Sequence, residues 1–204
     1  MKKILITGGA GFVGRRFTKY FLDRGDQVIV VDNISKFTGG IDPSKNWPLF
    51  NPYDYNNFKF YKQDCRLWFS HSKDRDFDYA LHLAAMVGGR EMIEHNPLAV
   101  ADDLSIDSHY WQWAKNNRPK KTLCFSSSAC YPIKLQTKNN YRLLKEDDIN
   151  LNKEISVPDL TYGWAKLTCE YLAKIAYERH SLKSICYRPF SGYGEDQDLN
   201  YPFT

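Results

Sequence analysis

The start of the chain combines two hydrophobic patterns. Residues 2–7 (KKILIT) and 26–32 (DQVIVVD) are short apolar runs rich in β-branched side chains, which is typical of buried strands. Between them, residues 11–24 carry apolar side chains at the spacing of one helical face, namely Phe12, Val13, Phe17, Tyr20, Phe21 and Leu22. The pattern predicts a strand, a crossover helix and a second strand, which together make a βαβ unit.

The same alternation continues along the chain. Further strands are predicted at residues 58–64, 78–85, 121–128 and 182–189, and helices at about 96–117 and 160–180. Strands joined by crossover helices form a parallel sheet covered on both faces, so we expect an α/β fold with a doubly wound Rossmann sheet. Segments 33–57 and 132–158 do not fit the alternation, and long loops in a compact domain tend to be functional.

A glycine-rich stretch follows the first predicted strand. In TGGAGFVG, Gly9, Gly11 and Gly14 satisfy the pattern G-x-G-x-x-G, and Gly8, Gly11 and Gly14 satisfy the related G-x-x-G-x-x-G. The stretch ends a strand and opens a helix, which is the context that this motif requires. Glycines there let the backbone turn tightly and approach a pyrophosphate, whose charge lies at the helix N-terminus. We therefore expect a dinucleotide site.

An acidic residue closes the second predicted strand. Asp32 lies 21 residues after Gly11 (32 minus 11), where an acidic side chain accepts hydrogen bonds from the adenosine ribose. Its charge repels a 2′-phosphate, so NAD is favoured over NADP. Arg15 and Arg16 weaken this preference, because a nearby guanidinium accommodates that phosphate. The expected cofactor contacts of this region are Gly8, Gly11, Phe12, Val13, Gly14 and Asp32.

Two later segments carry candidate catalytic chemistry. Tyr162 and Lys166 in TYGWAK are four residues apart on a predicted helix and hence share a face. A neighbouring ammonium and a nicotinium charge favour the phenolate, so Tyr162 is a candidate general acid/base and Lys166 the group that tunes it. The segment FSSSACYP, residues 125–132, ends a predicted parallel strand at the sheet edge where ligands bind. A serine hydroxyl there would hydrogen-bond a sugar hydroxyl or carbonyl.

Composition narrows the functional classes. The sequence has 204 residues, 43% of them hydrophobic, and a net charge of +4, as expected of a soluble protein of one domain. Its basic and acidic residues are spread along the chain, which is weak evidence for nucleic acid and fits a small anionic ligand at least as well. Five cysteines without a C-x-x-C pair suggest neither a disulfide framework nor a zinc site. We expect a cytoplasmic protein without a metal, a signal peptide or a membrane span.

Together these segments resemble the extended short-chain dehydrogenase/reductase family, and within it the NAD-dependent nucleotide-sugar epimerases and dehydratases. The resemblance runs from Lys2 to about Gly194. It implies that NAD takes a hydride from the sugar, that the keto intermediate reacts and that the hydride returns. The motifs that carry it are, in order, TGGAGFVG, Asp32, QDC (63–65), HLAAMVGG (82–89), SSSACYP, YGWAK and YRPFSGYG (187–194).

The resemblance also implies ligand contacts. Gly88 and Gly89 beside the nicotinamide would let the sugar approach closely, and Arg90 would meet a phosphate of the substrate. The implied cofactor contacts at the adenine, along the cofactor and at the nicotinamide ribose are Asp64 and Cys65, then Leu83, Ala84 and Ala85, and finally Tyr162 and Lys166.

The residues after the serine run bear on the type of reaction. The 4,6-dehydratases carry an Asp-Glu pair directly after the catalytic Ser/Thr, whereas Ala129 and Cys130 stand here, so dehydration is disfavoured. S-x-C with a following Y-P, and VGG after the fourth strand, look more like GDP-mannose 3,5-epimerase and GDP-fucose synthase. In those enzymes the cysteine is a base, which would require a substantial thiolate fraction at Cys130. The alternative for Cys130 is a small buried side chain at a strand end.

The catalytic serine depends on the alignment. Ser128 is the catalytic and substrate-binding serine if the segment is aligned on the strand and Cys130, and Ser127 if it is aligned on Tyr131. The shortened spacing between the cysteine and the tyrosine leaves both possible, and we favour Ser128.

Three functional hypotheses remain after this comparison. The first is an NAD-dependent nucleotide-sugar epimerase acting at carbons 3 and 5 of a GDP-sugar. A UDP-sugar 4-epimerase and a non-catalytic NAD-binding module are the alternatives. Relatives continue well beyond RPFSGYG, so we expect residues 1–194 to form the NAD-binding domain and 195–204 to begin a substrate-binding domain that is largely missing. In this family the helices near 96–117 and 160–180 pair across a two-fold axis, so a homodimer is expected.

Overall fold

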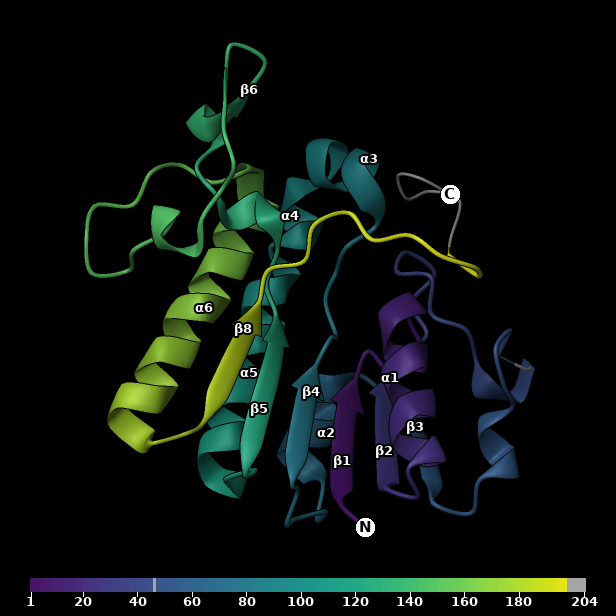
Figure 1. Ribbon diagram of the computed structural model, residues 1–204. Helices are drawn as coiled ribbons and strands as arrows, with labels where there is room; N and C mark the ends of the chain where they lie inside the picture. Colours follow the sequence, from purple (N-terminus) through teal and green to yellow (C-terminus); the bar gives the residue numbers. More distant parts are fainter. Residues whose placement is uncertain (46, 198–204) are drawn as a thin grey trace.

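A parallel sheet of six strands forms the centre of the molecule (Figure 1). The computed structural model describes residues 1–45 and 47–197. Its strands and α-helices are, in chain order, β1 (Lys3–Thr7), α1 (Phe12–Asp23), β2 (Gln27–Asp32), β3 (Phe58–Lys62), α2 (Cys65–His71), β4 (Tyr79–His82), α3 (Gly89–His95), α4 (Pro97–Val100), α5 (Asp102–Asn117), β5 (Lys121–Phe125), β6 (Gln136–Thr137), β7 (Asn140–Tyr141), α6 (Leu160–His180) and β8 (Ser184–Tyr187).

The strand order confirms the doubly wound Rossmann sheet. It runs β3-β2-β1-β4-β5-β8, and every neighbouring pair is parallel. The chain therefore winds outward from β1 in one direction through β2 and β3, and in the other through β4, β5 and β8. The reversal of direction between β1 and β4 opens a crevice at the carboxyl ends of these strands, which is where sheets of this type bind ligands.

Side chains alternate between two cores, one on each face of the sheet. Along β1, Ile4 and Ile6 point to one face, where they pack with Phe21 and Leu22 of α1. Leu5 points to the other face, which is covered by α2, α5 and α6. Both faces are buried, and this explains why the strands read as continuous apolar runs without polar alternation.

The prediction missed several short elements. Helices α2 and α3 have only seven residues each. The predicted helix 96–117 is in fact α4 and α5, with Ala101 between them. Segment 132–158 contains a separate two-stranded hairpin, β6–β7, and Figure 1 shows β6 beyond the carboxyl ends of β5 and β8. Elements of one or two turns bury too little apolar surface to leave a hydrophobic period in the sequence.

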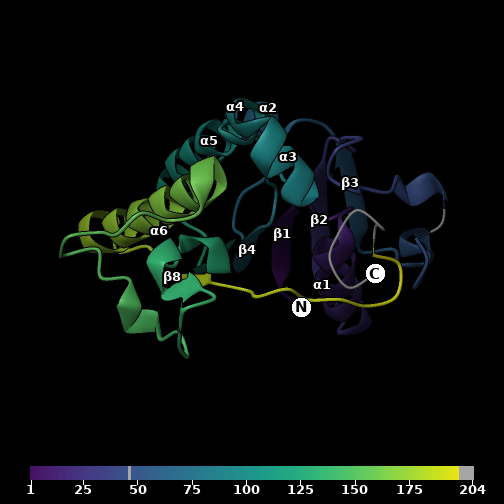
Figure 2. The ribbon, with the colours of Figure 1, turned by 90° about the horizontal axis from the view of Figure 1, so that it is seen from above.

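The segment after β8 returns across the carboxyl edge of the sheet toward α1, as Figures 1 and 2 both show. Near its end, the carboxylate of Asp196 contacts the guanidinium of Arg15 at 2.7 Å and that of Arg16 at 2.7 Å. The side chains of Arg15 and Asp196 are only 1% and 3% exposed, so this is a buried ion pair. We call residues 188–197 the return segment. Of the expected substrate-domain start at 195–204, residues 198–204 lie outside the described part of the chain.

Candidate functional site

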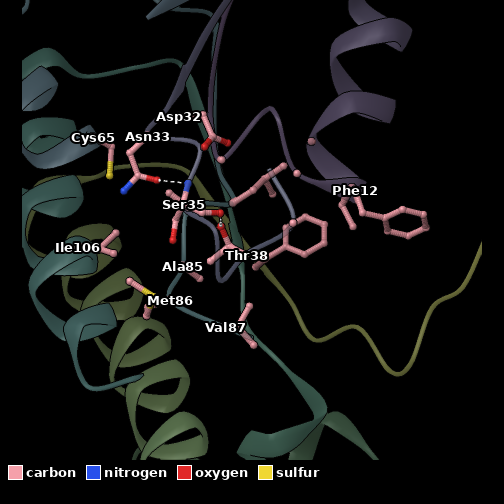
Figure 3. Close-up of a pocket in the computed structure, with 18 of the residues that line it drawn as sticks. Phe12, Asp32, Asn33, Ser35, Thr38, Cys65, Ala85, Met86, Val87 and Ile106 are labelled. Carbon is pink, nitrogen blue, oxygen red and sulfur yellow. Dashed lines mark hydrogen bonds between the residues drawn. The ribbon is translucent and has the colours of Figure 1, made fainter. Parts of the chain in front are cut away.

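A cavity of about 380 Å³ lies at the carboxyl ends of the strands. Figure 3 shows it from inside, with Phe12 of α1 on one side and Cys65 and Ile106 on the other. Its walls come from the turn between β1 and α1, the end of β2, the start of α2, the segment after β4, helices α5 and α6, and the return segment. The structure brings all of the predicted cofactor contacts to this cavity, namely Gly8, Gly11, Phe12, Val13, Gly14, Asp32, Asp64, Cys65, Leu83, Ala84, Ala85, Tyr162 and Lys166.

The glycine turn is close-packed and leaves no room for side chains. Gly8 has φ +69°, and a Cβ there would lie 2.6 Å from the amide nitrogen of Ala84. A Cβ on Gly14 would lie 2.3 Å from the carbonyl oxygen of Gly8. Gly11 is different, because its Cβ would meet only the Gly8 oxygen, at 3.3 Å, and Gly11 lies on the cavity at the start of α1. The turn thus presents bare backbone to the cavity beside a helix N-terminus, which fits a pyrophosphate.

Asp32 places a buried carboxylate at the adenosine end of the cavity. One oxygen accepts the Ala10 amide at 3.0 Å and the other the Ile34 amide at 2.8 Å. Burial raises the pKa of Asp32, against the opposing effect of these two amides. Each oxygen keeps a free lone pair, so the carboxylate can still accept two ribose hydroxyls. This geometry fits the sugar of a dinucleotide.

The two arginines that follow the glycine turn are occupied by the protein itself. Arg15 donates to the carbonyl oxygen of Ala10 at 2.7 Å and to Asp196. Arg16 donates to Asp196 and to the carbonyl oxygen of Glu195, both at 2.7 Å. These contacts engage the charges that would otherwise accommodate a 2′-phosphate. Arg15 and Arg16 therefore no longer weaken the preference for NAD over NADP.

The start of α2 forms the predicted adenine border. The Asp64 carboxylate caps the helix by accepting the Arg66 amide at 2.8 Å, and the Arg66 guanidinium lowers the pKa of this carboxyl. Burial raises the pKa of the neighbouring Cys65 thiol to about 12. Cys65 is thus a neutral, apolar wall of the cavity at physiological pH.

Tyr162 and Lys166 lie one turn apart near the start of α6. The Lys166 ammonium is 5.7 Å from the centre of the Tyr162 ring and 3.2 Å from the Asp103 carboxylate on α5. Burial raises the pKa of Tyr162, while the Lys166 charge and a hydrogen bond from Ser127 lower it. Burial alone would lower the pKa of Lys166, but Asp103 and Asp107 raise it well above its usual value. The lysine is therefore a permanent charge beside the tyrosine.

Of the two candidate serines, Ser127 is the one that the structure places beside Tyr162. Ser127 hydrogen-bonds the tyrosine hydroxyl and is 9% exposed. Its hydroxyl oxygen also accepts the Ala129 amide at 3.1 Å, which starts a 3₁₀ turn containing Ser128. This geometry favours Ser127 over our choice of Ser128, and the catalytic role of either serine stays a prediction.

Cys130 does not have the surroundings of a thiolate base. Its side chain is 1% exposed and packs with Tyr131, Ile149 and Leu167 in a small apolar cluster. Burial raises the pKa of the Cys130 thiol to about 12. Among the described residues, the cavity wall does not include Cys130. These surroundings favour the alternative of a small buried side chain, and a catalytic role of Cys130 stays a prediction.

Two other predicted substrate contacts have structural partners instead. Gly88 packs closely, since a Cβ there would lie 2.7 Å from the sulfur of Met92. The Arg90 guanidinium pairs with Glu94 at 2.6 Å and with Asp159, at the start of α6. Within the part of the chain that is described, neither Gly88 nor Arg90 is in the cavity wall. Their contact with a substrate stays a prediction.

Sequence reasoning missed several cavity residues. Asn33, Ser35 and Thr38 lie in the segment after β2 that did not fit the strand and helix alternation, and its length was the signal available. Nothing in the sequence indicated that Asp103 would contact Lys166. An acidic residue in the first turn of a helix usually stabilises the helix through its interaction with the helix dipole. Over residues 1–45 and 47–197, no cluster of His, Cys, Asp and Glu has the makeup of a metal site, and no helix is long and apolar enough to cross a membrane.

Known proteins resemble the chain in both sequence and structure. UDP-glucuronate 4-epimerase of Thermodesulfobacterium geofontis is 29% identical over 194 residues, covering 93% of this chain and 56% of the relative. UDP-glucose 4-epimerase of Halalkalibacterium halodurans is 26% identical, covering 95% and 52%. The structure of UDP-N-acetylglucosamine 4-epimerase from Methanobrevibacter ruminantium, in complex with UDP-N-acetylmuramic acid, superposes with a TM-score of 0.77 at 28% identity, covering 99% of this chain and 59% of that one.

The chain thus spans somewhat more than half the length of these relatives. Within that span the match is continuous, since residues 4–202 fit a single family model. The glycine turn, Asp32 and the Tyr162–Lys166 pair lie inside the matched region and line one cavity, as binding of NAD requires. The chain belongs to the NAD dependent epimerase/dehydratase family.

Proposed function

We propose that this chain carries the NAD-binding and catalytic part of a UDP-sugar 4-epimerase. The observation that carries this proposal is the placement of Tyr162, with Ser127 and Lys166 beside it, in the same cavity as the glycine turn. A single acid/base next to a dinucleotide is sufficient for reversible oxidation of one carbinol. The 4-epimerase names of similar proteins support the choice of substrate class.

The chain's own residues would act on the proton of the reacting hydroxyl. NAD, when bound along the glycine turn and Asp32, would supply the hydride acceptor and later the hydride donor. The Tyr162 phenolate, stabilised by the Lys166 charge, would take the proton of the sugar 4-hydroxyl and so become the neutral phenol. Ser127 would hold the substrate oxygen by a hydrogen bond, and the tyrosine would return the proton to the inverted hydroxyl.

The structure supports inversion at carbon 4 over inversion at carbons 3 and 5. Inversion next to a ketone needs a base that removes a carbon-bound proton, and Cys130 was the candidate for it. Its thiol is buried, with a pKa of about 12, and lies outside the cavity wall formed by the described residues. Inversion at carbon 4 needs no second base, because the keto sugar only has to present its other face to the returned hydride.

A pair of variants tests this proposal. The protein is incubated with NAD and UDP-glucose, UDP-N-acetylglucosamine or UDP-glucuronate, and the 4-epimer is detected by proton NMR. Tyr162→Phe should abolish turnover by more than about a hundredfold while NAD binding, measured by calorimetry, is retained. Cys130→Ala should keep turnover. A Cys130→Ala variant that folds but loses 4-epimerisation would contradict the proposal, and NAD binding without turnover of any sugar would support a non-catalytic module.

We also propose a homodimer formed by α5 and α6. The outer faces of these two adjoining helices expose large apolar side chains, with Leu104, Leu160, Trp164 and Tyr171 between 42% and 47% exposed. Exposed apolar surface of this kind marks protein contacts. Light scattering after gel filtration should give twice the chain mass, and Trp164→Glu should give the single mass; a wild-type monomer would contradict the proposal. Cytoplasmic localisation, consistent with five free cysteines, is tested by cell fractionation.

A further inference from the structure

The side chain of Asp103 joins two walls of the cavity. One carboxylate oxygen accepts the amide of Met86, in the segment after β4. The other lies 3.2 Å from the ammonium of Lys166, on α6. Asp103 and Lys166 are 1% and 5% exposed, so neither charge is screened by bulk water. Asp103 therefore fixes the ammonium relative to the segment after β4 as well as neutralising it.

Two carboxylates face the single ammonium of Lys166. From α5, both Asp103 and Asp107 face the ammonium, and from α6 Tyr162 and Cys169 do so. Asp107 has a second partner, because its carboxylate lies 3.1 Å from the imidazole of His82 on β4. Within residues 1–45 and 47–197, Asp103 contacts no charged side chain besides Lys166. The ammonium is therefore shared between two carboxylates, and Asp103 is the one in direct contact with it.

This sharing affects Tyr162. The groups that face the tyrosine are Lys166 on its own helix, Asp103 on α5, and Ser127 and Cys130 in the turn after β5. Lys166 and Asp103 act on the tyrosine hydroxyl in opposite directions, because a positive charge favours the phenolate and a negative charge opposes it. The carboxylate lies 3.2 Å from the ammonium, and its effect on the tyrosine is smaller than that of Lys166, so it offsets part of the lysine's field there.

We propose that Asp103 is a positioning residue of the catalytic site: it holds the Lys166 ammonium against the segment after β4 and limits how much of the lysine's positive charge reaches the Tyr162 hydroxyl. The proposal rests on the assignment of Tyr162 as the acid/base in the proposed function. It deepens that assignment by naming the group that sets the pH at which the tyrosine is active. In a chain with an uncharged residue at position 103, the tyrosine would form its phenolate at lower pH.

The test follows Tyr162 directly and needs no turnover. Tyrosines are labelled with ¹³C at Cζ, and the chemical shift is recorded against pH with and without NAD. Tyr162 is one of 14 tyrosines, so its signal is assigned by its loss in Tyr162→Phe. Asp103→Asn should move the Tyr162 midpoint to lower pH by about one pH unit. Asp148→Asn, which removes a carboxylate from an exposed ion pair with Arg142, should leave the midpoint unchanged.

A double variant keeps the test decisive if Asp103→Asn fails to fold. Asp103→Asn/Lys166→Met removes both charges of the pair and leaves neither partner alone. Because Asp103 offsets only part of the lysine's effect, the Tyr162 midpoint in the double variant should rise, but by about half a pH unit less than in Lys166→Met alone. A double variant with the same midpoint as Lys166→Met, or an unchanged midpoint in Asp103→Asn, would overturn the proposal. Neither result bears on whether Tyr162→Phe abolishes epimerisation, so the proposed function is judged separately.

Discussion

The carboxylates at the two ends of the cavity are buried in different ways. Asp32, at the adenosine end, accepts hydrogen bonds from two backbone amides and lies 8% exposed. Asp103, at the catalytic end, is fully buried and faces the ammonium of Lys166. The Arg15 charge opposes the effect of burial on the pKa of Asp32 but does not outweigh it, so the first carboxylate is only partly compensated, whereas the second contacts a cationic side chain directly.

This difference indicates which end depends on the ligand. Hydroxyl groups of a bound ribose would donate to Asp32 and supply part of the missing compensation, so NAD binding and Asp32 ionisation should favour each other. The catalytic end needs no such help, because Lys166 and Asp103 neutralise each other within the chain. The catalytic geometry is thus preorganised, whereas the adenosine end is completed by its ligand.

Removing the cation at the catalytic end should have the largest effect on stability. Lys166→Met leaves Asp103 without its partner in the protein interior, which costs about 3–5 kcal/mol of unfolding free energy. Urea denaturation followed by circular dichroism measures this loss. Lys174→Met is the matched control on the same helix, because Lys174 forms an exposed pair with Glu178, and it should cost less than about 0.5 kcal/mol. Equal losses in the two variants would refute the comparison.

Breaking the buried ion pair of the return segment should have the second-largest effect on stability. Asp196→Asn leaves the Arg15 guanidinium, 1% exposed, without a countercharge and costs about 3 kcal/mol. It should also speed NAD release, because the return segment forms part of the cavity wall, and stopped-flow fluorescence measures that rate. Lys62→Met removes an exposed pair with Asp42 and serves as the control. A release rate equal to that of the control would show that the segment does not retain the cofactor.

Removing the charge at the adenosine end should have a smaller effect on stability and a clear one on binding. Asp32→Asn should weaken NAD binding about thirtyfold, or about 2 kcal/mol, because it removes hydrogen bonds to a charged acceptor. Burial raises the pKa of Asp32 above its ordinary 3.8. The stability that Asp32 contributes is therefore present below pH 3.8 and is lost as the pH rises through the higher folded value.

The pH dependence of stability provides a second test of the prediction for Asp32. The Tm of Asp32→Asn should exceed that of the wild type at neutral pH, and the difference should shrink as the pH falls toward the ordinary value of an aspartate. Differential scanning calorimetry of both proteins without NAD measures it. A difference that grows on acidification would mean that the Asp32 carboxylate stabilises the fold, contrary to the comparison.

Arg90→Gln should have the smallest effect on folding. Arg90 is 54% exposed in its side chain and pairs with Glu94 and Asp159 at the surface, so the unfolding free energy should change by less than about 0.5 kcal/mol. If Arg90 also meets a substrate phosphate, KM for the nucleotide sugar should rise several-fold while kcat stays constant. An unchanged KM would leave Arg90 with only its structural contacts.

The sequence predicted the adenosine end better than the catalytic end. Glycine positions and the acidic residue at the end of β2 follow from backbone geometry, which is local in sequence, and the structure brings both to one cavity. The partner of Lys166 is Asp103, 63 residues earlier (166 minus 103), and only the packing of α5 on α6 brings the two together. The surroundings of Ser128 and Cys130 differ from those we expected for a related reason. The hydrogen bond of a serine to Tyr162 and the burial of Cys130 depend on contacts between segments that are distant in the sequence, and the local spacing of residues does not reveal such contacts.

The return segment has a consequence for synthesis on the ribosome. Arg15 emerges 181 residues before its countercharge, Asp196. A nascent chain that has formed β1, α1 and β2 must therefore keep a guanidinium hydrated at the place where the finished protein buries it. Final packing of α1 has to wait for translation of the return segment, so this helix is completed long after it is made.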